Sequence, residues 1–164
     1  MRKALAAALC LVLLAASGTA LAEKTVTLTF VGDCTLGGED WLINREGSFH
    51  DYARKEGYTY FFEKLRDFFS EDDLTIINFE GVLKDDSRDA VNKTYCFRGP
   101  TDFARILPLS SIEAVNLDNN HTLDYGKRGK TSTVEALTGA GVHVFDELTP
   151  YIFEKDGIKI AFFG

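Results

Sequence analysis

The chain has 164 residues, of which 45% are hydrophobic and 26% are charged, and its formal net charge is −7 at pH 7. This length is enough for one domain with a buried core. The acidic balance argues against a nucleic-acid-binding surface, which requires clustered Lys and Arg. It also argues against an anionic ligand unless a local positive charge, such as a metal ion, offsets the repulsion.

The first 22 residues have the pattern of a secretory signal peptide. Two basic residues precede an apolar run from Ala4 to Ala16, and a small-x-small cleavage pattern follows at Ala20-Leu21-Ala22. The apolar run is shorter than the ~20 residues of a membrane-spanning helix, so we favour cleavage over an uncleaved membrane anchor. Cleavage would lower the net charge from −7 to −9, because two basic residues and no acidic residue are lost.

The first half of the remaining chain predicts two buried strands separated by a helix. The stretch KTVTLTFVGD indicates a central strand that ends at Gly-Asp, and LTIINFEG indicates a second strand. Between them, after a long polar segment that contains several glycines, YTYFFEKLRDFFSEDD has apolar residues at helical spacing. We expect this stripe to face the core, and its members are Tyr58, Phe61, Phe62, Leu65, Phe68 and Phe69.

Shorter elements are expected in the middle of the chain. The charged segment 85–93 predicts a solvated surface loop. The stretch TYCFRGP indicates a short edge strand, and TDFARIL indicates one or two helical turns capped by Thr101 or Asp102.

The last part of the chain predicts one more helix among strands. The stretch SIEAVNL indicates a third buried strand. We expect a helix that starts at Ser132, with a capping box to Glu135, and ends at Gly139 or Gly141. The stretch VHVFD indicates another strand, and YIFEKDGIKIAFF indicates a hairpin that turns at Asp-Gly.

Strands and helices in alternation predict an α/β fold. We expect a layered sandwich in which flanking helices cover both faces of a mostly parallel sheet. The terminal stretch GIKIAFFG indicates an apolar strand that no later element covers. The expected domain therefore spans residues 23–164 and lacks its C-terminal half.

Three of the predicted strands end on polar side chains. These side chains are Asp33, Asn78, Glu80, Asn119, Asn120 and His121. Because ligands collect at the carboxyl ends of parallel strands, we expect these groups to meet at one edge of the sheet. Carboxylate, amide and imidazole groups suit Mn, Mg, Zn or Fe, so the expected cofactor is a divalent metal ion. We expect Asn78 and Asn119 to contact the substrate.

Each of these residues also has a structural explanation. Asp33 alone fits an ordinary Gly-Asp turn, Glu80 fits a loop cap, and the two asparagines fit a turn that Gly126 closes. Together, the polar ends of all three strands favour a site. We expect His121 to bind the metal or to donate a proton beside it, and Asp124 to orient the imidazole ring.

Four other side chains have simpler interpretations. We expect His50 to lie on the surface and His143 to pack within a strand. Cys34 and Cys96 fit a disulfide bridge and two separate thiols equally well.

Three motifs, FVGDCTLGG, DLTIINFEGVL and VNLDNNHTLDYG, occur in this order. In order and spacing they resemble those of the CapA-type poly-γ-glutamate capsule synthesis proteins, whose third motif is nearly ANNHxxDYG. The resemblance covers about Thr25 to Gly164. The CapA-type family is in turn similar to the calcineurin-like metallophosphoesterases, which are two-sheet α/β sandwiches with a metal site at the strand ends.

The resemblance implies roles for individual residues. Asp33 matches the first metal-binding aspartate, and Glu80 stands at the position of the bridging acid. Asn120 matches an asparagine that binds metal, and His121 matches the histidine that donates a proton or steadies the reacting group. The stretch after Asp33 has no histidine where phosphoesterases have Asp-x-His. The later histidine motifs of the family do not occur before Gly164, so we expect the chain to contain only the first half of the site.

Three functions fit these expectations. The first is an exported bacterial protein of the cell envelope that handles poly-γ-glutamate or another anionic polymer at a metal-dependent, hydrolase-like site, together with membrane proteins of capsule synthesis. The second is a secreted metallophosphoesterase that acts on phosphate esters. The third is a non-catalytic module for polymer binding or assembly. None of these three functions requires a nucleic-acid partner. None requires a transmembrane segment once the signal peptide has been cleaved.

Overall fold

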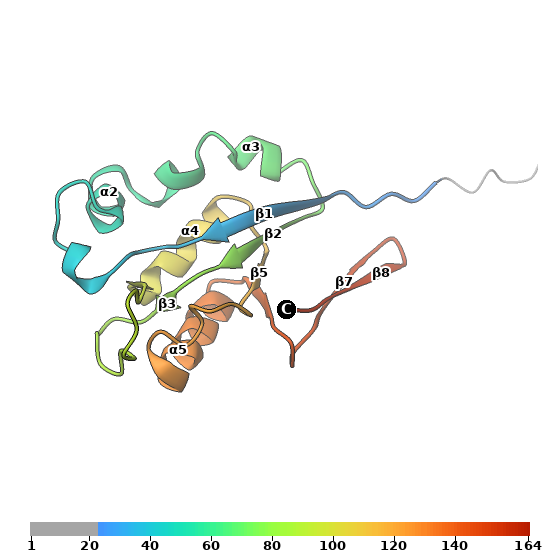
Figure 1. Cartoon of the computed structure of the whole chain (residues 1–164). Helices are drawn as coiled ribbons and strands as arrows, with labels where there is room; N and C mark the ends of the chain where they lie inside the picture. The colour runs from blue at the N-terminus through green and yellow to red at the C-terminus, as the bar shows by residue number, and fades with distance from the viewer. Residues whose placement is uncertain (1–22) are drawn as a thin grey trace, which may run out of the picture.

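The computed structural model describes residues 23–164, so the predicted signal peptide lies outside the described residues. A four-stranded sheet in the order β1-β2-β5-β6 forms the centre of the fold, and all neighbouring strands in it are parallel (Figure 1). Its strands are β1 (Leu28–Cys34), β2 (Leu74–Phe79), β5 (Ala114–Asn116) and β6 (His143–Phe145).

Helices and two small sheets surround the central sheet. The helical elements are η1 (Asp40–Leu42), α2 (Phe49–Glu56), η2 (Tyr58–Phe62), α3 (Arg66–Phe69), η3 (Thr101–Arg105), α4 (Ile106–Leu109) and α5 (Gly126–Gly139). The small sheets pair β3 (Val82–Leu83) with β4 (Arg98–Gly99) in parallel and β7 (Tyr151–Lys155) with β8 (Ile158–Phe162) in antiparallel. None of the described helices is long and apolar enough to cross a membrane.

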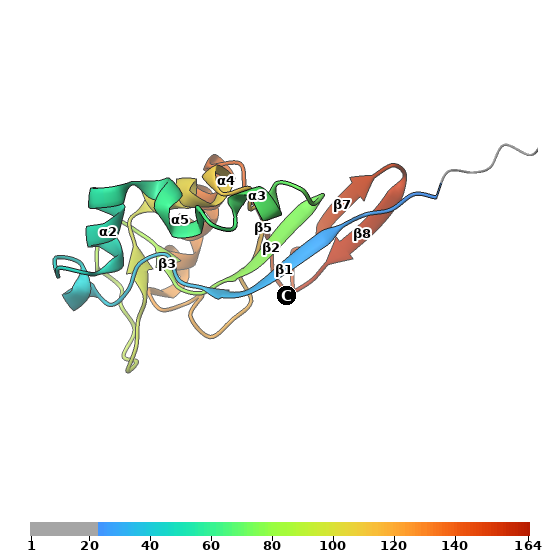
Figure 2. The ribbon, with the colours of Figure 1, turned by 90° about the horizontal axis from the view of Figure 1, so that it is seen from above.

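The two faces of the central sheet are covered differently. The helices lie on one side of the sheet, where their apolar residues pack with Ile77 and Val115 in the main core (Figure 2). On the other face, Ile76 and Ala114 form a smaller core with Phe162 of the β7–β8 hairpin. The predicted α/β class, with a mostly parallel sheet and flanking helices, is confirmed. A hairpin rather than a helix covers the second face.

The first strand lies at an edge of the sheet, so the prediction of a central strand was wrong. β1 pairs with β2 and has no second neighbour among the described residues. Phe30 in the middle of β1 is 65% exposed. An apolar run resembles a central strand in sequence, but strand order depends on long-range pairing that the run itself does not encode.

The segment between β1 and β2 differs most from its prediction. The helix α2 was missed, although Ser48 caps it by accepting a hydrogen bond from the Asp51 backbone N–H. The expected single helix is instead η2 followed by α3, and Phe68 is 60% exposed. A 3₁₀ segment has three residues per turn, so the apolar stripe drifts out of phase with an α-helical face. Leu65 is exposed for the same reason.

The helix α5 begins six residues before the predicted start at Ser132. Its first residue is Gly126, and the Ser132 hydroxyl donates to the Leu83 carbonyl rather than forming a capping box. The predicted cap of the middle turns is also wrong, because the Thr101 backbone N–H and hydroxyl both donate to Asp85. In both places a hydroxyl that suits a local cap bonds instead to a distant segment.

The predicted hairpin at the end of the chain is confirmed. Five residue pairs join β7 and β8, from Tyr151–Phe162 to Lys155–Ile158. Asp156 and Gly157 form the turn with φ angles of 53° and 82°. Two consecutive residues with positive φ are typical of the two-residue turn that matches strand twist, and Asp-Gly favours it.

Candidate functional site

A β-bulge aligns polar side chains across the ends of three strands. The register between β1 and β2 shifts between Val31 and Asp33, so Gly32 has no partner and Asp33 lies opposite Asn78. Asn78 in turn lies opposite Asn116 of β5. Bulges re-aim side chains at sheet edges. Here the bulge places Asp33, Asn78 and Asn116 in one row at the carboxyl ends of the strands.

Asn78 is the centre of this group. Its Nδ2 donates to Asp33 Oδ1 at 2.8 Å and to Glu80 Oε1 at 3.3 Å. Its Oδ1 accepts from Nδ2 of Asn116 at 3.0 Å and from Nδ2 of Asn119 at 3.1 Å. We call these five residues the carboxylate cluster. The predicted meeting of Asp33, Asn78, Glu80 and Asn119 is what the structure shows.

The carboxylate cluster contains more acceptors than donors. Asp33 and Glu80 both rely on the same amide nitrogen, which is uncharged. An ionised carboxylate has about four lone-pair sites, so both groups keep free acceptor capacity. Burial, together with the smaller effect of the Asp33 charge, raises the pKa of the adjacent Cys34 thiol to about 11. Cys34 is therefore a neutral thiol and a poor metal ligand.

A second group forms around Asp124, whose side chain is 1% exposed. Its Oδ1 accepts from Lys93 Nζ at 2.8 Å, and its Oδ2 accepts from the Phe97 backbone N–H at 2.8 Å. His121 Nδ1 also lies 2.8 Å from Oδ2. We call Lys93, Phe97, His121 and Asp124 the histidine cluster. The expected partnership of Asp124 with His121 is therefore present.

The surroundings of the imidazole define its tautomer. Because Asp124 Oδ2 is an acceptor, it favours a proton on Nδ1 of His121, and in that tautomer Nε2 is the nitrogen with the lone pair. The Phe97 ring stacks on the imidazole with a centroid distance of 4.4 Å and an interplanar angle of 24°. Lys93 Nζ lies 3.3 Å from Nδ1 and balances the buried carboxylate charge. His121 is thus held in one orientation, with Nδ1 toward Asp124 and Nε2 without a hydrogen bond to residues 23–164.

Asn119 joins the two clusters. Its Oδ1 accepts from the His121 backbone N–H at 3.0 Å, while its Nδ2 donates to Asn78 and to the Phe79 carbonyl. Asn120 does not join either cluster through its side chain, which is exposed and has no hydrogen bond to residues 23–164. The Asn120 carbonyl instead accepts from Lys93 Nζ at 2.7 Å. The role of Asn120 as a metal ligand stays a prediction.

Three residues of the site were missed by sequence reasoning. Asn116 lies in the third strand itself, and only the register with Asn78 reveals it. Lys93 ends a charged segment that was predicted as solvated surface, which holds for most of 85–93 but not for its contact with Asp124. Phe97 contributes a backbone N–H and a ring face. No local sequence signal distinguishes such contacts.

The other predictions on histidine and cysteine are also resolved. His50 is buried against Phe103, so its prediction as a surface residue was wrong. His143 is exposed and stacks on Tyr151 at 4.2 Å. Cys34 and Cys96 are both free thiols. None of these four side chains belongs to either cluster.

The donor set suits a hard divalent cation, although it is incomplete within the described residues. Residues 23–164 contain no group of three or more His, Cys, Asp and Glu side chains arranged to hold a metal ion. Asp33 and Glu80 supply two carboxylates that share one amide donor. Such oxygen ligands fit Mg or Mn, and an added imidazole fits Zn or Fe.

Comparisons with known proteins agree with the motifs. The model of a family described as bacterial capsule synthesis protein matches residues 27–164. A capsule biosynthesis protein CapA of Bacillus anthracis is 25% identical over 154 residues, covering 87% of this chain and 35% of that protein. A probable polyglutamine synthesis accessory protein of Mycobacterium tuberculosis is 39% identical over 70 residues, covering 43% of this chain and 18% of that protein. The chain thus spans about a third or less of the length of these relatives.

Proposed function

Since the chain belongs to the bacterial capsule synthesis protein family, we propose that it handles poly-γ-glutamate at a metal-assisted site formed by its two clusters. The observation that carries this proposal is the row of Asp33, Asn78 and Asn116 beside a fixed histidine. Names of relatives that refer to capsule biosynthesis and polyglutamine synthesis support the choice of polymer.

A metal ion would be held by the carboxylate cluster. Asp33 and Glu80 have free carboxylate oxygens, and the exposed amide of Asn120 is the third candidate ligand. When bound, a divalent ion would offset the charge of an anionic polymer and polarise an acyl oxygen. This matters here because the chain carries a net charge of −7.

His121 is the candidate acid or base. Its Nδ1 faces Asp124, so Nε2 is the atom that can exchange a proton with a ligand. Asp124 and Phe97 fix the orientation of the ring, and Lys93 donates a hydrogen bond to the Asp124 carboxylate. These three residues position His121 and do not themselves touch the substrate.

The site of action is proposed to be outside the cytoplasm. The signal-like pattern of residues 1–22 supports export to the cell envelope, where a capsule polymer is handled. Membrane proteins of capsule synthesis are proposed as partners.

Binding and turnover of γ-linked glutamate oligomers test the proposal. The purified protein is titrated with oligomers by calorimetry in Mn²⁺, Zn²⁺, Mg²⁺ or EDTA, and oligomer length is followed by mass spectrometry. We expect metal-dependent binding, and loss of any turnover in His121→Ala. The matched control is His143→Ala, because His143 is exposed at the start of β6 and outside both clusters.

The outcomes separate the alternatives. Binding without turnover would favour an assembly module over an enzyme. Release of phosphate from an aryl phosphate that disappears in His121→Ala would favour a phosphoesterase. No binding of γ-linked oligomers under any metal would refute the proposal.

A further inference from the structure

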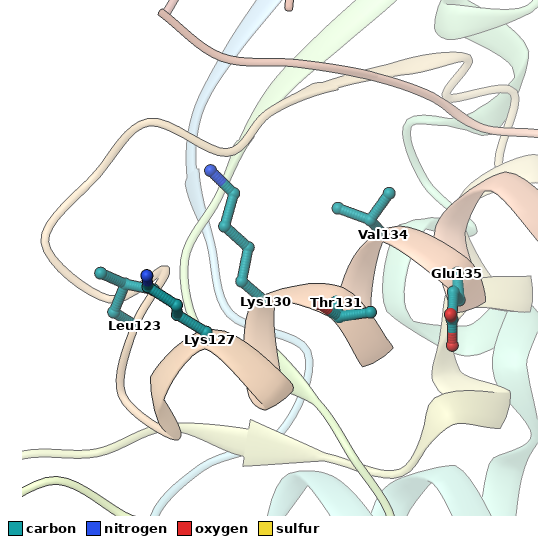
Figure 3. A pocket seen from close by; sticks show the side chains of 6 residues that line it. All are labelled: Leu123, Lys127, Lys130, Thr131, Val134 and Glu135. Carbon is teal, nitrogen blue, oxygen red and sulfur yellow. The ribbon is translucent and has the colours of Figure 1, made fainter. Parts of the chain in front are cut away.

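A groove of about 650 Å³ runs along the exposed side of α5 (Figure 3). Its lining residues are Leu123, Lys127, Lys130, Thr131, Val134 and Glu135. They recur at the three- and four-residue spacing of one helix face, apart from Leu123 in the preceding loop. A groove of this size falls within the range of small-ligand pockets.

Two lining residues of the groove, Leu123 and Lys130, connect it to the candidate site. Leu123 lies between His121 and Asp124 in the loop before α5, so one wall of the groove belongs to the same loop as the histidine cluster. Lys130 Nζ bonds Asp146 Oδ2 at 2.7 Å, and Asp146 directly follows β6. A ligand in the groove would therefore continue toward the carboxyl ends of the strands.

The positive charge of the groove is concentrated at one end. Lys127 is exposed and forms no ion pair with residues 23–164, so its charge is free for a ligand. The Lys130 ammonium is shared with Asp146, and this bond holds the pKa of the Asp146 carboxyl below its usual range. Glu135 lies at the far end from Leu123 and Lys127, as Figure 3 shows. An anion is thus attracted near Lys127 and repelled near Glu135.

The same groove has apolar walls. Leu123 is 51% exposed, although His121 and Asp124 on either side of it in the sequence are buried. Val134 lies two turns along α5 from Lys127 and also lines the groove. An aliphatic chain with regularly spaced anionic groups matches this combination of leucine, valine and lysine.

We propose that the α5 groove binds a segment of γ-linked glutamate chain next to the candidate site. In such a chain the two methylene groups of each residue lie in the main chain, and each residue keeps a free α-carboxylate. The carboxylates would bond Lys127 and Lys130, and the methylene groups would contact Leu123 and Val134. This inference rests on the proposed function, because it takes its polymer from there.

Charge substitutions in the full chain test the groove. The probes are fluorescent γ-linked and α-linked glutamate oligomers of equal length, with binding followed by anisotropy at low and high salt. We expect Lys127→Gln to weaken binding of the γ-linked probe about fivefold at low salt, as for an exposed ion pair worth about 1 kcal/mol. Lys127→Arg should retain binding, and Glu135→Gln should strengthen it.

A matched control removes the same charge elsewhere. Lys64 is an exposed lysine between η2 and α3 without an ion pair to residues 23–164, so Lys64→Gln should bind like the unmodified chain. If Lys127→Gln and Lys64→Gln both bind γ-linked probe like the unmodified chain, the groove inference fails while the proposed function stands. If the unmodified chain does not bind γ-linked probe, both fail. Equal binding of α-linked probe overturns the methylene contacts.

Discussion

The two clusters of the candidate site differ in how completely their polar groups are satisfied. In the histidine cluster, the buried Asp124 carboxylate accepts from Lys93, His121 and a backbone N–H. In the carboxylate cluster, Asp33 is exposed and shares one uncharged amide with Glu80. The first cluster is preorganised by the protein alone, whereas the second keeps open positions for a cation. Removal of a carboxylate should therefore affect stability in the first cluster and ligand binding in the second.

The largest expected effect on stability is at Asp124. Asp124→Ala leaves the Phe97 N–H, the His121 Nδ1 and the Lys93 ammonium without their common acceptor. We expect a loss of about 2–3 kcal/mol in the free energy of unfolding, below the full value for a buried ion pair because Lys93 is partly exposed. Urea unfolding followed by circular dichroism measures it.

Asp33→Ala is the matched comparison in the carboxylate cluster. It removes an exposed carboxylate with one neutral donor, so unfolding should change little while Mn²⁺ binding weakens. Equal destabilisation by Asp33→Ala and Asp124→Ala would contradict the distinction between the clusters.

The next effect concerns α5, which follows the loop of the histidine cluster. A Cβ at Gly129 would lie 2.7 Å from Tyr125 Cβ and 3.1 Å from Val82 Cγ1. Gly129→Ala should therefore push α5 away from β3 and destabilise the fold by about 2 kcal/mol. Thermal unfolding measures this change.

The same helix offers the control. A Cβ at Gly139, the last residue of α5, would meet no atom within 4 Å. Gly139→Ala should stabilise by about 0.5 kcal/mol, because alanine has less freedom in the unfolded chain. Two changes of the same sign would show that packing against Val82 does not hold α5 in place.

A smaller effect is expected at the centre of the carboxylate cluster. Asn78→Ala removes the amide that bonds Asp33 and Glu80 and the oxygen that accepts from Asn119. We expect destabilisation of about 1–2 kcal/mol, since Asn78 is half-buried and its partners regain water. Chemical denaturation measures the loss, with Asn92→Ala in the exposed loop as the control. A loss in Asn78→Ala no greater than in Asn92→Ala would show that Asn78 does not hold the carboxylate cluster together.

The sequence predicted features set by neighbouring residues better than contacts between residues that are far apart in the chain. Asp33, Asn78 and Asn119 can be recognised in the sequence at the ends of predicted strands. The rule that the carboxyl ends of parallel strands meet at one edge was enough to group them. The Asp124–His121 pair was also predictable, because the two residues are close in sequence. Lys93 and Phe97 were not, because their contacts cross an irregular loop whose course no periodic pattern records.

The errors in the fold have the same origin. Apolar runs identified β2 and β5, and alternation with an Asp-Gly turn identified the hairpin. Periodicity failed between β1 and β2, where a 3₁₀ segment changes the repeat. It also failed at Ser132, whose hydroxyl bonds Leu83 across the fold rather than its own helix. Local signals are ambiguous wherever a side chain has a tertiary alternative.

The smallest expected effect compares the two buried histidines. His121 has its Nδ1 bonded to Asp124, but His50 Nε2 is buried and has no hydrogen-bond partner within residues 23–164. Burial lowers the pKa of His50 below its ordinary value of 6.5, and the charges of Arg98 and Arg54 lower it further against the opposing effect of Asp40. The unfolded chain therefore binds this proton more tightly, so His50 lowers the stability of the fold as pH falls below 6.5.

His50→Phe removes this titration and the unpaired nitrogen while keeping a ring against Phe103. We expect a gain of about 1 kcal/mol at pH 7 and a larger gain at pH 5, because the variant lacks the stability loss that proton binding to unfolded His50 causes. Urea unfolding of both proteins at pH 7, 6 and 5 measures the difference. A difference that stays constant from pH 7 to pH 5 would mean that His50 keeps its ordinary pKa in the fold, which is incompatible with its burial in an unpaired state.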